Sequence, residues 1–499
     1  VGRSPRPKEV IVDPSDAERP HPDVQLDWVG SLKNAARLVA GLHRGEKRMV
    51  FCDSRARTEE LVHDLGVNGV DAHISHSSLS RELRSFSEEA FTRAAEGVIV
   101  ATSTLELGID LGDLDRVLQI DAPSRVANFL QRLGRTGRRS GTRANCLFLA
   151  THEQAFLRAA GLLQLWSEGY VEPVTPPPRP FHVLAQQLMA LCLQTGGASD
   201  DDLKALLLSY PLSALDVEKV LAALDSLYER GILFKDAGKT WLGAEGERRF
   251  QRRQFMDLLS MITDSPLFTV LHGQKELGQV DRASLLVEQE GPTVLLLAGR
   301  SWRVENIDWR RKRCWVKAVE DRGKSRWLGE GPPLGFELCQ AIRRVLAGDS
   351  TPPGLTRRGA DKLEELRSEF AWLSASDAGS FFETLDASRV RWWTFAGLLG
   401  NASLLGWLDF ELEKPPPFDS LSMTFPKDLA DRVRERLTSS PANTGNIQPF
   451  LSERALETLK FAECLPPPLV NEAVSSRWAD VPAAKAVTET PFAVVMPDL

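Results

Sequence analysis

Short apolar runs alternate with longer amphipathic stretches over residues 23–172. The apolar runs fall at 48–52, 97–102, 114–120 and 144–149, and the stretch 58–65 has the pattern of an amphipathic helix. Buried strands separated by helices at this spacing are typical of a mostly parallel sheet that is covered on both faces. The pattern therefore predicts an α/β lobe over residues 23–172, preceded by a tail or linker at 1–22.

The rest of the chain predicts three further domains after a stiff linker. Residues 173–180 are rich in proline. Because proline fixes φ and has no N–H donor, this segment is expected to be a stiff linker that separates domains. Three helical stretches followed by two short strands predict a winged helix (α+β) over 181–245. Recurring short β-rich runs predict a small β-barrel over 246–348, and helical periodicity predicts a mainly α-helical C-terminal domain over 355–499.

Composition narrows the class of protein without deciding its function. Hydrophobic residues make up 42% of the 499-residue chain, and no apolar stretch reaches the length of a membrane span. The six cysteines are scattered and form no CxxC pair, and the histidines show no metal-ligand spacing, so we expect no metal site and a cytoplasmic location. A net charge of −7 excludes a uniformly basic nucleic-acid binder, and any such surface must be local.

The most specific motif is the run QRLGRTGRR at residues 131–139. Its two glycines allow tight turns, and Arg135 and Arg138 are spaced to point to one side at a helical start. Guanidinium groups so placed suit a terminal phosphate, where charge must be neutralised as the γ-phosphoryl group leaves. An exposed basic helix start is the alternative interpretation of this motif taken alone.

A buried strand runs into the segment ATSTLELGID at residues 101–110. Hydroxyl and N–H groups at the carboxyl end of a parallel strand are placed to hold phosphate oxygens, which makes Thr102 and Ser103 candidates. Asp110 could accept a hydrogen bond from a hydroxyl group. Helix capping is the alternative role for Thr102 and Ser103.

Together these two segments resemble motifs V and VI of superfamily 2 helicases, in the expected order and spacing. Residues 49–55 resemble motif IV, and residues 76–82 resemble the short block after it, although 77–82 also fits a capping box. The resemblance implies a RecA-like lobe that contacts ATP and a nucleic-acid strand. The implied roles are arginine fingers for Arg135 and Arg138, a place near the γ-phosphate or attacking water for Gln131, ATP contacts for Gly108 and Asp110, and strand phosphate contacts for Ser54, Arg55, Ser77, Ser78, Thr102 and Ser103.

Two motor elements do not occur in the sequence. It contains neither a GxxxxGK[ST] phosphate loop nor a DExx box with the carboxylate for magnesium. We therefore expect ATP and Mg²⁺ to be bound mainly by a first lobe that lies upstream or on a partner chain. The chain alone is predicted not to hydrolyse ATP.

Beyond the motor lobe, the chain resembles Lhr-type (large helicase-related) helicases over nearly its whole length. The segments that carry this resemblance are 101–110, 131–139, 241–250, 297–309 and 391–397. The resemblance implies a single-strand-dependent ATPase that translocates 3′ to 5′ and unwinds DNA or RNA–DNA duplexes, in repair or phage defence.

Basic and aromatic residues interleave between residues 300 and 327, and such surfaces bind single strands by stacking and charge. Arg303, Trp309, Arg311 and, further on, Trp392 are our candidate contacts. The alternative is that the tryptophans fill a core; Trp392 and Trp393 would point about 100° apart in a helix, so one of them is expected to be buried. Two rival functions remain open, a non-enzymatic nucleic-acid or partner-binding module and a winged-helix regulator of transcription.

Overall fold

The first sheet of the molecule is six-stranded and entirely parallel. The computed structural model describes residues 21–106, 114–139, 141–209, 212–250, 255–260, 267–281, 294–297, 300–319, 334–374, 377–410, 416–439, 449 and 459–495. The strands are β1 (Asp23–Trp28), β2 (Lys47–Phe51), β3 (His73–Ser75), β4 (Gly97–Ala101), β5 (Arg116–Ile120) and β6 (Asn145–Ala150), in the spatial order β1-β6-β5-β2-β4-β3. The helices are α1 (Leu32–Gly41), α2 (Arg55–Val67), α3 (Arg81–Arg93), α4 (Val126–Leu133) and α5 (Glu153–Ser167).

Alternation along the central strands explains this layered arrangement. Met49 and Phe51 of β2 belong to one hydrophobic cluster, whereas Val50 belongs to a second cluster on the opposite face. Successive side chains of a strand point to opposite faces, so a strand that is apolar at every position must be covered on both. The predicted α/β lobe is confirmed, and β1 and β3 are two strands that the sequence pattern did not identify.

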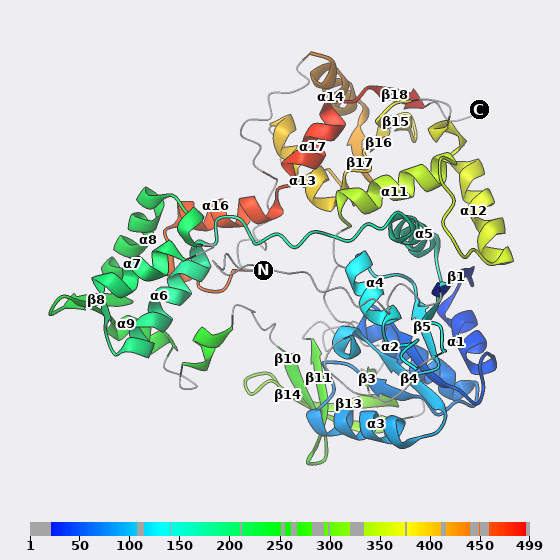
Figure 1. Ribbon diagram of the computed structural model, residues 1–499, viewed down its shortest axis with the longest axis horizontal. Helices are drawn as coiled ribbons and strands as arrows, with labels where there is room; N and C mark the ends of the chain where they lie inside the picture. Colours follow the sequence, from blue (N-terminus) through cyan, green and yellow to red (C-terminus); the bar gives the residue numbers. More distant parts are fainter. Residues whose placement is uncertain are drawn as a thin grey trace.

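The winged-helix region follows the Pro-rich segment. It consists of α6 (Phe181–Thr195), β7 (Ala198–Ser199), α7 (Asp200–Leu208), α8 (Val217–Glu229), β8 (Leu233–Asp236), β9 (Lys239–Leu242) and α9 (Ala244–Phe250). Ser199 and Asp202 form a capping box that starts α7. A helix from far along the sequence, α16 (Pro467–Trp478), packs into the same core and lies beside the green helices in Figure 1.

The predicted small barrel is instead an open sheet in the part of the chain that the structure describes. Its strands are β10 (Leu267–His272), β11 (Lys275–Asp281), β12 (Val294–Leu297), β13 (Arg300–Asp308) and β14 (Arg313–Val319), in the order β11-β10-β14-β13-β12. The two end strands are not paired with each other among these residues, so the prediction of a closed barrel is not supported. The sheet packs Phe268 and Val270 into the same hydrophobic cluster as Val50 of the parallel-sheet lobe, so one face of the sheet is buried against that lobe.

The C-terminal region is not only helical. A sheet in the order β17-β16-β15-β18 joins β15 (Ser380–Thr384), β16 (Arg389–Trp393), β17 (Ser422–Pro426) and β18 (Phe492–Val495). Its helices are α11 (Phe336–Ala347), α12 (Arg357–Glu369), α13 (Gly397–Leu408), α14 (Lys427–Ser439) and α17 (Val481–Thr488). Within the described residues, every helix is too short or too polar to cross a bilayer.

Candidate functional site

Three loops meet at the carboxyl edge of the parallel sheet. Because β2, β3 and β4 are neighbours with the same direction, the residues that follow them lie at one edge. Ser54 follows β2, where its side chain caps α2 by accepting from the Arg57 N–H at 3.2 Å. Thr102 and Ser103 follow β4; Thr102 is buried and Ser103 is exposed. The structure thus brings the predicted strand-binding residues of these blocks together.

The residues after β3 are tied to the start of α2. Ser77 is exposed, whereas Ser78 is buried and its Oγ accepts a hydrogen bond of 2.5 Å from Nη1 of Arg55. The side chain of Ser80 caps α3 by accepting from the Leu83 N–H. The capping interpretation of this block therefore holds at Ser80. Ser77 stays a candidate for strand contact, whereas Ser78 is buried and its hydroxyl is already bonded to Arg55.

The arginine motif lies at the end of a helix rather than at its start. Helix α4 ends at Leu133, and Gln131 is exposed on its last turn. Arg135 is buried, and its guanidinium donates to the backbone oxygen of Glu106, within the 101–110 segment. Arg138 is exposed and donates through Nε to the carbonyl oxygen of Gly134 at 3.1 Å. The expected helical spacing was wrong, because the chain turns at Gly134 and leads both arginines out of α4.

Gly137 makes this turn against the start of β6. Its φ is +70°, and a Cβ atom there would lie 2.4 Å from the backbone nitrogen of Ala144. Only glycine adopts this backbone without strain and leaves room for the neighbouring strand. The second glycine of the motif therefore fixes where Arg138 leaves the lobe.

Arg132 is the residue that the sequence analysis missed. It is buried, and its guanidinium contacts Glu106 at 2.6 Å, Asp53 at 2.8 Å and the side-chain oxygen of Gln119. Burial alone would lower the pKa of Arg132, but the two carboxylates together raise it. This side chain joins the loops after β2 and β4 to α4. Its position within the arginine motif was visible in the sequence, but its partners lie 26 and 79 residues away and were not.

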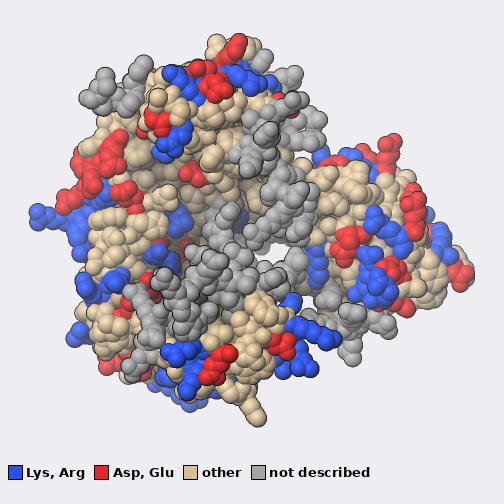
Figure 2. Space-filling view, turned by 180° about the vertical axis from the view of Figure 1, so that it is seen from behind, with Lys and Arg blue, Asp and Glu red and all other residues tan. Residues whose placement is uncertain are grey.

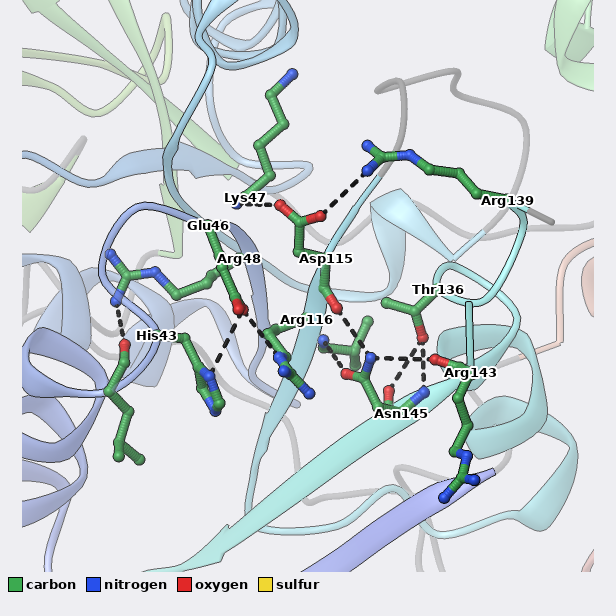
Figure 3. A network of polar contacts seen from close by, with 12 residues as sticks. His43, Glu46, Lys47, Arg48, Asp115, Arg116, Thr136, Arg139, Arg143 and Asn145 are labelled. Atoms are coloured by element: carbon green, nitrogen blue, oxygen red, sulfur yellow. Dashed lines mark hydrogen bonds and ion pairs between the residues drawn. The ribbon is translucent and has the colours of Figure 1, made fainter. Parts of the chain in front are cut away.

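A basic pocket of about 300 Å³ adjoins the arginine motif. Figure 3 shows the polar contacts of several of its lining residues, among them Glu46, Asp115, Arg116 and Arg139. The pocket is lined by Arg135, Arg138 and residues at the amino ends of β2, β5 and β6, namely Glu46, Leu114, Asp115, Arg116, Gly137, Arg139, Thr142, Arg143 and Asn145. Glu46 binds Arg116 at 2.8 Å, and Asp115 contacts Arg139 at 3.4 Å. Five arginines face two carboxylates, so the pocket has a surplus of positive charge that suits an anion.

The environment of Arg135 also favours an anion at this position. Burial and the neighbouring Arg138 lower the pKa of Arg135, which means that the charged form is disfavoured relative to water. An anionic group brought to this position would relieve that cost. Gly108 and Asp110, the other predicted ATP contacts, lie outside the described residues.

The structure describes one group of carboxylates close enough to share an ion, and none of its members lines the basic pocket. Glu153, Glu365 and Glu369 are all exposed on α5 and α12. Exposed acidic groups of this kind are common without a metal, so they carry no functional argument.

The candidate contacts on the five-stranded sheet lie on its surface. Arg303 is exposed on β13, and Arg311 is exposed in the turn before β14, with Asp308 at 3.7 Å. Trp309 is 44% exposed and packs edge-on against Phe268. Trp302 is buried and donates to the carbonyl oxygen of Leu297, so it fills the core. The alternative of a core role thus applies to Trp302 and not to Trp309.

Trp392 must be removed from the candidates. It lies on strand β16 rather than a helix, is fully buried, and stacks on Phe382 with ring centroids 5.3 Å apart. No face of its ring is open to a base. Trp393, which points to the other side of the strand, is half-buried and donates to Glu383.

Two protein families match the chain. The helicase conserved C-terminal domain matches residues 31–140, and the winged helix domain of large helicase-related proteins matches residues 164–325. The chain is 27% identical over 317 residues to the ATP-dependent helicase Lhr-Core of Methanothermobacter thermautotrophicus, over 59% of this chain and 36% of that protein. It is 30% identical over 291 residues to the Lhr helicase/uracil glycosylase of Escherichia coli, over 54% of this chain and 18% of that protein. The chain thus spans less than half the length of these relatives.

The fold is similar to that of a solved helicase. The Mycobacterium smegmatis helicase Lhr, whose structure is bound to ssDNA and AMP-PNP, matches with a TM-score of 0.67 over 95% of this chain and 69% of that chain. At 20% sequence identity this likeness establishes the arrangement of the domains and not the roles of residues.

Proposed function

Since the chain belongs to the Lhr-type (large helicase-related) superfamily 2 helicases, we propose that it supplies the second motor lobe and accessory domains of an ATP-dependent 3′–5′ helicase. The substrate is single-stranded DNA, and the complete motor unwinds DNA or RNA–DNA duplexes. A first lobe, present upstream or on a partner chain, presents the phosphate loop and magnesium ligands. ATP hydrolysis belongs to the two lobes together, and this chain alone is inactive.

The observation that carries the proposal is the placement of Arg135 and Arg138 beside a basic pocket. Arg135 is anchored to the 101–110 segment, and both arginines line the pocket with its surplus of positive charge. In the proposed motor they neutralise charge on the γ-phosphate of ATP as the phosphoryl group leaves, and Gln131 lies near the attacking water. Gly108 and Asp110 contact the nucleotide in this proposal.

The carboxyl edge supplies the proposed grip on the strand. Hydroxyl groups of Ser54, Ser77 and Ser103 and the guanidinium of Arg55 suit phosphate oxygens, which position a strand without reading its sequence. Thr102 is buried and acts through its backbone position in the same loop. Ser78 holds Arg55 in place.

The accessory sheet extends the proposed grip. Arg303 and Arg311 supply charge, and the exposed ring of Trp309 supplies a stacking face, which contributes about 1–3 kcal/mol per base in single-strand binding. Closure of the two lobes around ATP would move the nucleic-acid strand along the contacts at the carboxyl edge. The winged helix and the five-stranded sheet would prevent the strand from moving back.

The test is to supply a first lobe of an Lhr-type helicase and to measure single-strand-stimulated ATP hydrolysis. Arg138→Ala is expected to lower kcat by about 10³-fold or more with single-strand binding retained. Arg93→Ala is the matched control, because Arg93 is exposed on α3, is paired with Glu89 outside the pocket, and is expected to change kcat little.

Loss of strand binding in Arg138→Ala, with kcat per bound complex unchanged, would contradict the assigned role. A chain that binds single strands but never supports hydrolysis with any first lobe would favour the rival function, a non-enzymatic nucleic-acid or partner-binding module.

A further inference from the structure

Beneath the carboxyl edge lies a fully buried pair of ionisable side chains. Nε2 of His76, in the loop after β3, is 2.8 Å from Oε1 of Glu59 on α2, and neither side chain has any exposed surface. Burying such groups costs free energy unless their hydrogen bonds are satisfied, and an apolar pair of similar volume would fill the space without that cost. The pair therefore calls for a role beyond packing.

The hydrogen bonds of the ring fix its tautomer. Nδ1 of His76 accepts a hydrogen bond from the backbone N–H of Ser78 at 3.3 Å. In the neutral ring the proton must then be on Nε2, from which it is donated to Glu59. Glu59 thus orients the ring, and the ring in turn holds the backbone of Ser78.

Ser78 joins two parts of the molecule. Its Oγ accepts from Arg55 at 2.5 Å, and its carbonyl oxygen accepts from the backbone N–H of Gln279 on β11 at 2.6 Å. The approach to β11 is so close that a Cβ atom on Gly278 would lie 2.2 Å from the same carbonyl oxygen. A second bond, from Ser80 N–H to the carbonyl oxygen of Leu277 at 3.2 Å, completes the junction.

We propose that Glu59 and His76 are positioning residues that hold the backbone of Ser78. Through Ser78 they link the contact of Arg55 with a phosphate of the nucleic-acid strand to the position of the five-stranded sheet. The inference rests on the proposed function for the strand contact at Arg55. Neither Glu59 nor His76 can contact the nucleic-acid strand itself, because both side chains are buried.

Two substitutions of His76 each remove one of the two hydrogen bonds of its ring and keep the other. His76→Asn keeps an oxygen near the position of Nδ1 that can accept from Ser78, and loses the bond to Glu59. His76→Gln keeps a donor near Nε2 for Glu59, and loses the acceptor for Ser78. His73→Gln is the matched control, since His73 lies on β3, just before the loop of His76, and contacts Phe91 instead.

The experiment measures binding of the full chain to a labelled oligodeoxythymidine over a range of salt concentrations. His76→Gln is expected to weaken binding about threefold to tenfold and to reduce the salt slope by about 0.7, the loss of one phosphate contact. His76→Asn is expected to recover part of the affinity. In an Arg55→Ala background, His76→Gln is expected to weaken binding no further, because its effect runs through Arg55.

Two outcomes separate failure of the inference from failure of the proposed function. Wild-type chain that does not bind the oligonucleotide contradicts the proposed strand contact. Wild-type chain that binds, with additive losses in the double variant or with an equal loss in His73→Gln, overturns the positioning role.

Hydrogen exchange tests the junction without any ligand. Backbone amides of residues 276–281 are expected to exchange faster in His76→Gln than in His73→Gln, because the bond from Gln279 to Ser78 is weakened. Equal exchange in the two variants would also overturn the inference.

Discussion

Arg132 and Arg135 are three residues apart but face different surroundings. Arg132 is on the last turn of α4 and points into the lobe, where two carboxylates surround it. Arg135 lies after the helix has ended and lines the basic pocket. The buried arginine sets the position of the helix end, and the second arginine faces the basic pocket from that position.

Replacing Arg132 is expected to be costly. Arg132→Met leaves the buried carboxylate of Glu106 without its partner, which is expected to lower the free energy of unfolding by about 3–5 kcal/mol. Arg139→Met is the matched control, since Arg139 is exposed and its pair with Asp115 contributes under about 1 kcal/mol. Urea unfolding of the wild-type chain, Arg132→Met and Arg139→Met measures their free energies of unfolding. Equal midpoints for the two variants would contradict the structural role assigned to Arg132.

The glycines and arginines of residues 131–138 led to the prediction of a phosphate-facing motif, and that role stays a prediction. The sequence pattern could not separate Arg132 from the other arginines. The partners of Arg132 come from loops far along the chain, and only the folded sheet brings them to one place. The same reason explains the error at Trp392, whose burial depends on Phe382 on the neighbouring strand.

Helices α5 and α11 join the motor lobe to the C-terminal region through a close contact at Gly161. A Cβ atom there would lie 2.7 Å from Cγ1 of Ile342 and 3.1 Å from its backbone nitrogen. A backbone contact of this kind cannot be relieved by rotating a side chain. Gly161 thus sets the distance between the two helices.

Gly161→Ala is expected to push α11 away and to lower the free energy of unfolding by about 1–3 kcal/mol. In Gly66→Ala, on α2, the new Cβ meets no atom within 4 Å, and the gain in helix propensity is expected to stabilise the chain by up to about 1 kcal/mol. Thermal unfolding of the two variants should therefore shift in opposite directions. A shift of the same sign in both would contradict the packing argument.

A histidine links the winged-helix region to α16. His182 on α6 is buried with Arg477 beside it at 3.4 Å, and burial together with that charge lowers the pKa of His182 to about 4. In the unfolded chain the pKa returns to about 6.5, so folding favours the neutral ring. This contribution is complete above pH 6.5 and is lost as the pH falls towards 4.

The expected size of the loss is roughly 3 kcal/mol over that pH range. His182→Gln should remove this part of the pH dependence, so that the variant loses less stability than wild type between pH 7 and pH 4.5. His21→Gln, at an exposed position, is the control. Midpoints of thermal unfolding at several pH values give the comparison, and parallel curves for wild type and His182→Gln would contradict the assignment.

Elements with a strong apolar period were predicted closely and those defined by tertiary contacts were not. The strands around residues 50, 99, 118 and 147 have continuous apolar runs, and each falls within a described strand. The four strands of the C-terminal sheet are short and lie among longer helices, so this region was predicted to be mainly helical. Their pairing, with β18 joining β15 from the far end of the chain, is a long-range property.

At the scale of the whole molecule, cores are shared between regions that the sequence separates. The five-stranded sheet completes one face of the motor lobe, and α11 and α12 cover the other. Figure 1 shows the winged-helix region to one side, with α16 reaching it from the C-terminal region. The accessory parts are thus built onto the motor lobe, which suits a proposed machine in which movement of one lobe carries its accessory domains.

On the face shown in Figure 2, the coloured Lys and Arg side chains are interspersed with Asp and Glu side chains and form small groups. This agrees with the net charge of −7 and with the expectation that any surface for nucleic acid is local. The surplus of arginine beside the motif at 131–138 is one such local group.

In the proposed motor, this chain contributes the arginines and another lobe carries the phosphate loop. ATP hydrolysis is measured with and without single-stranded DNA, for the chain alone, for a first lobe alone and for the two together. Neither part alone is expected to show stimulated hydrolysis, and the mixture is expected to show it. Stimulated hydrolysis by this chain alone, abolished by Arg138→Ala, would contradict the proposal.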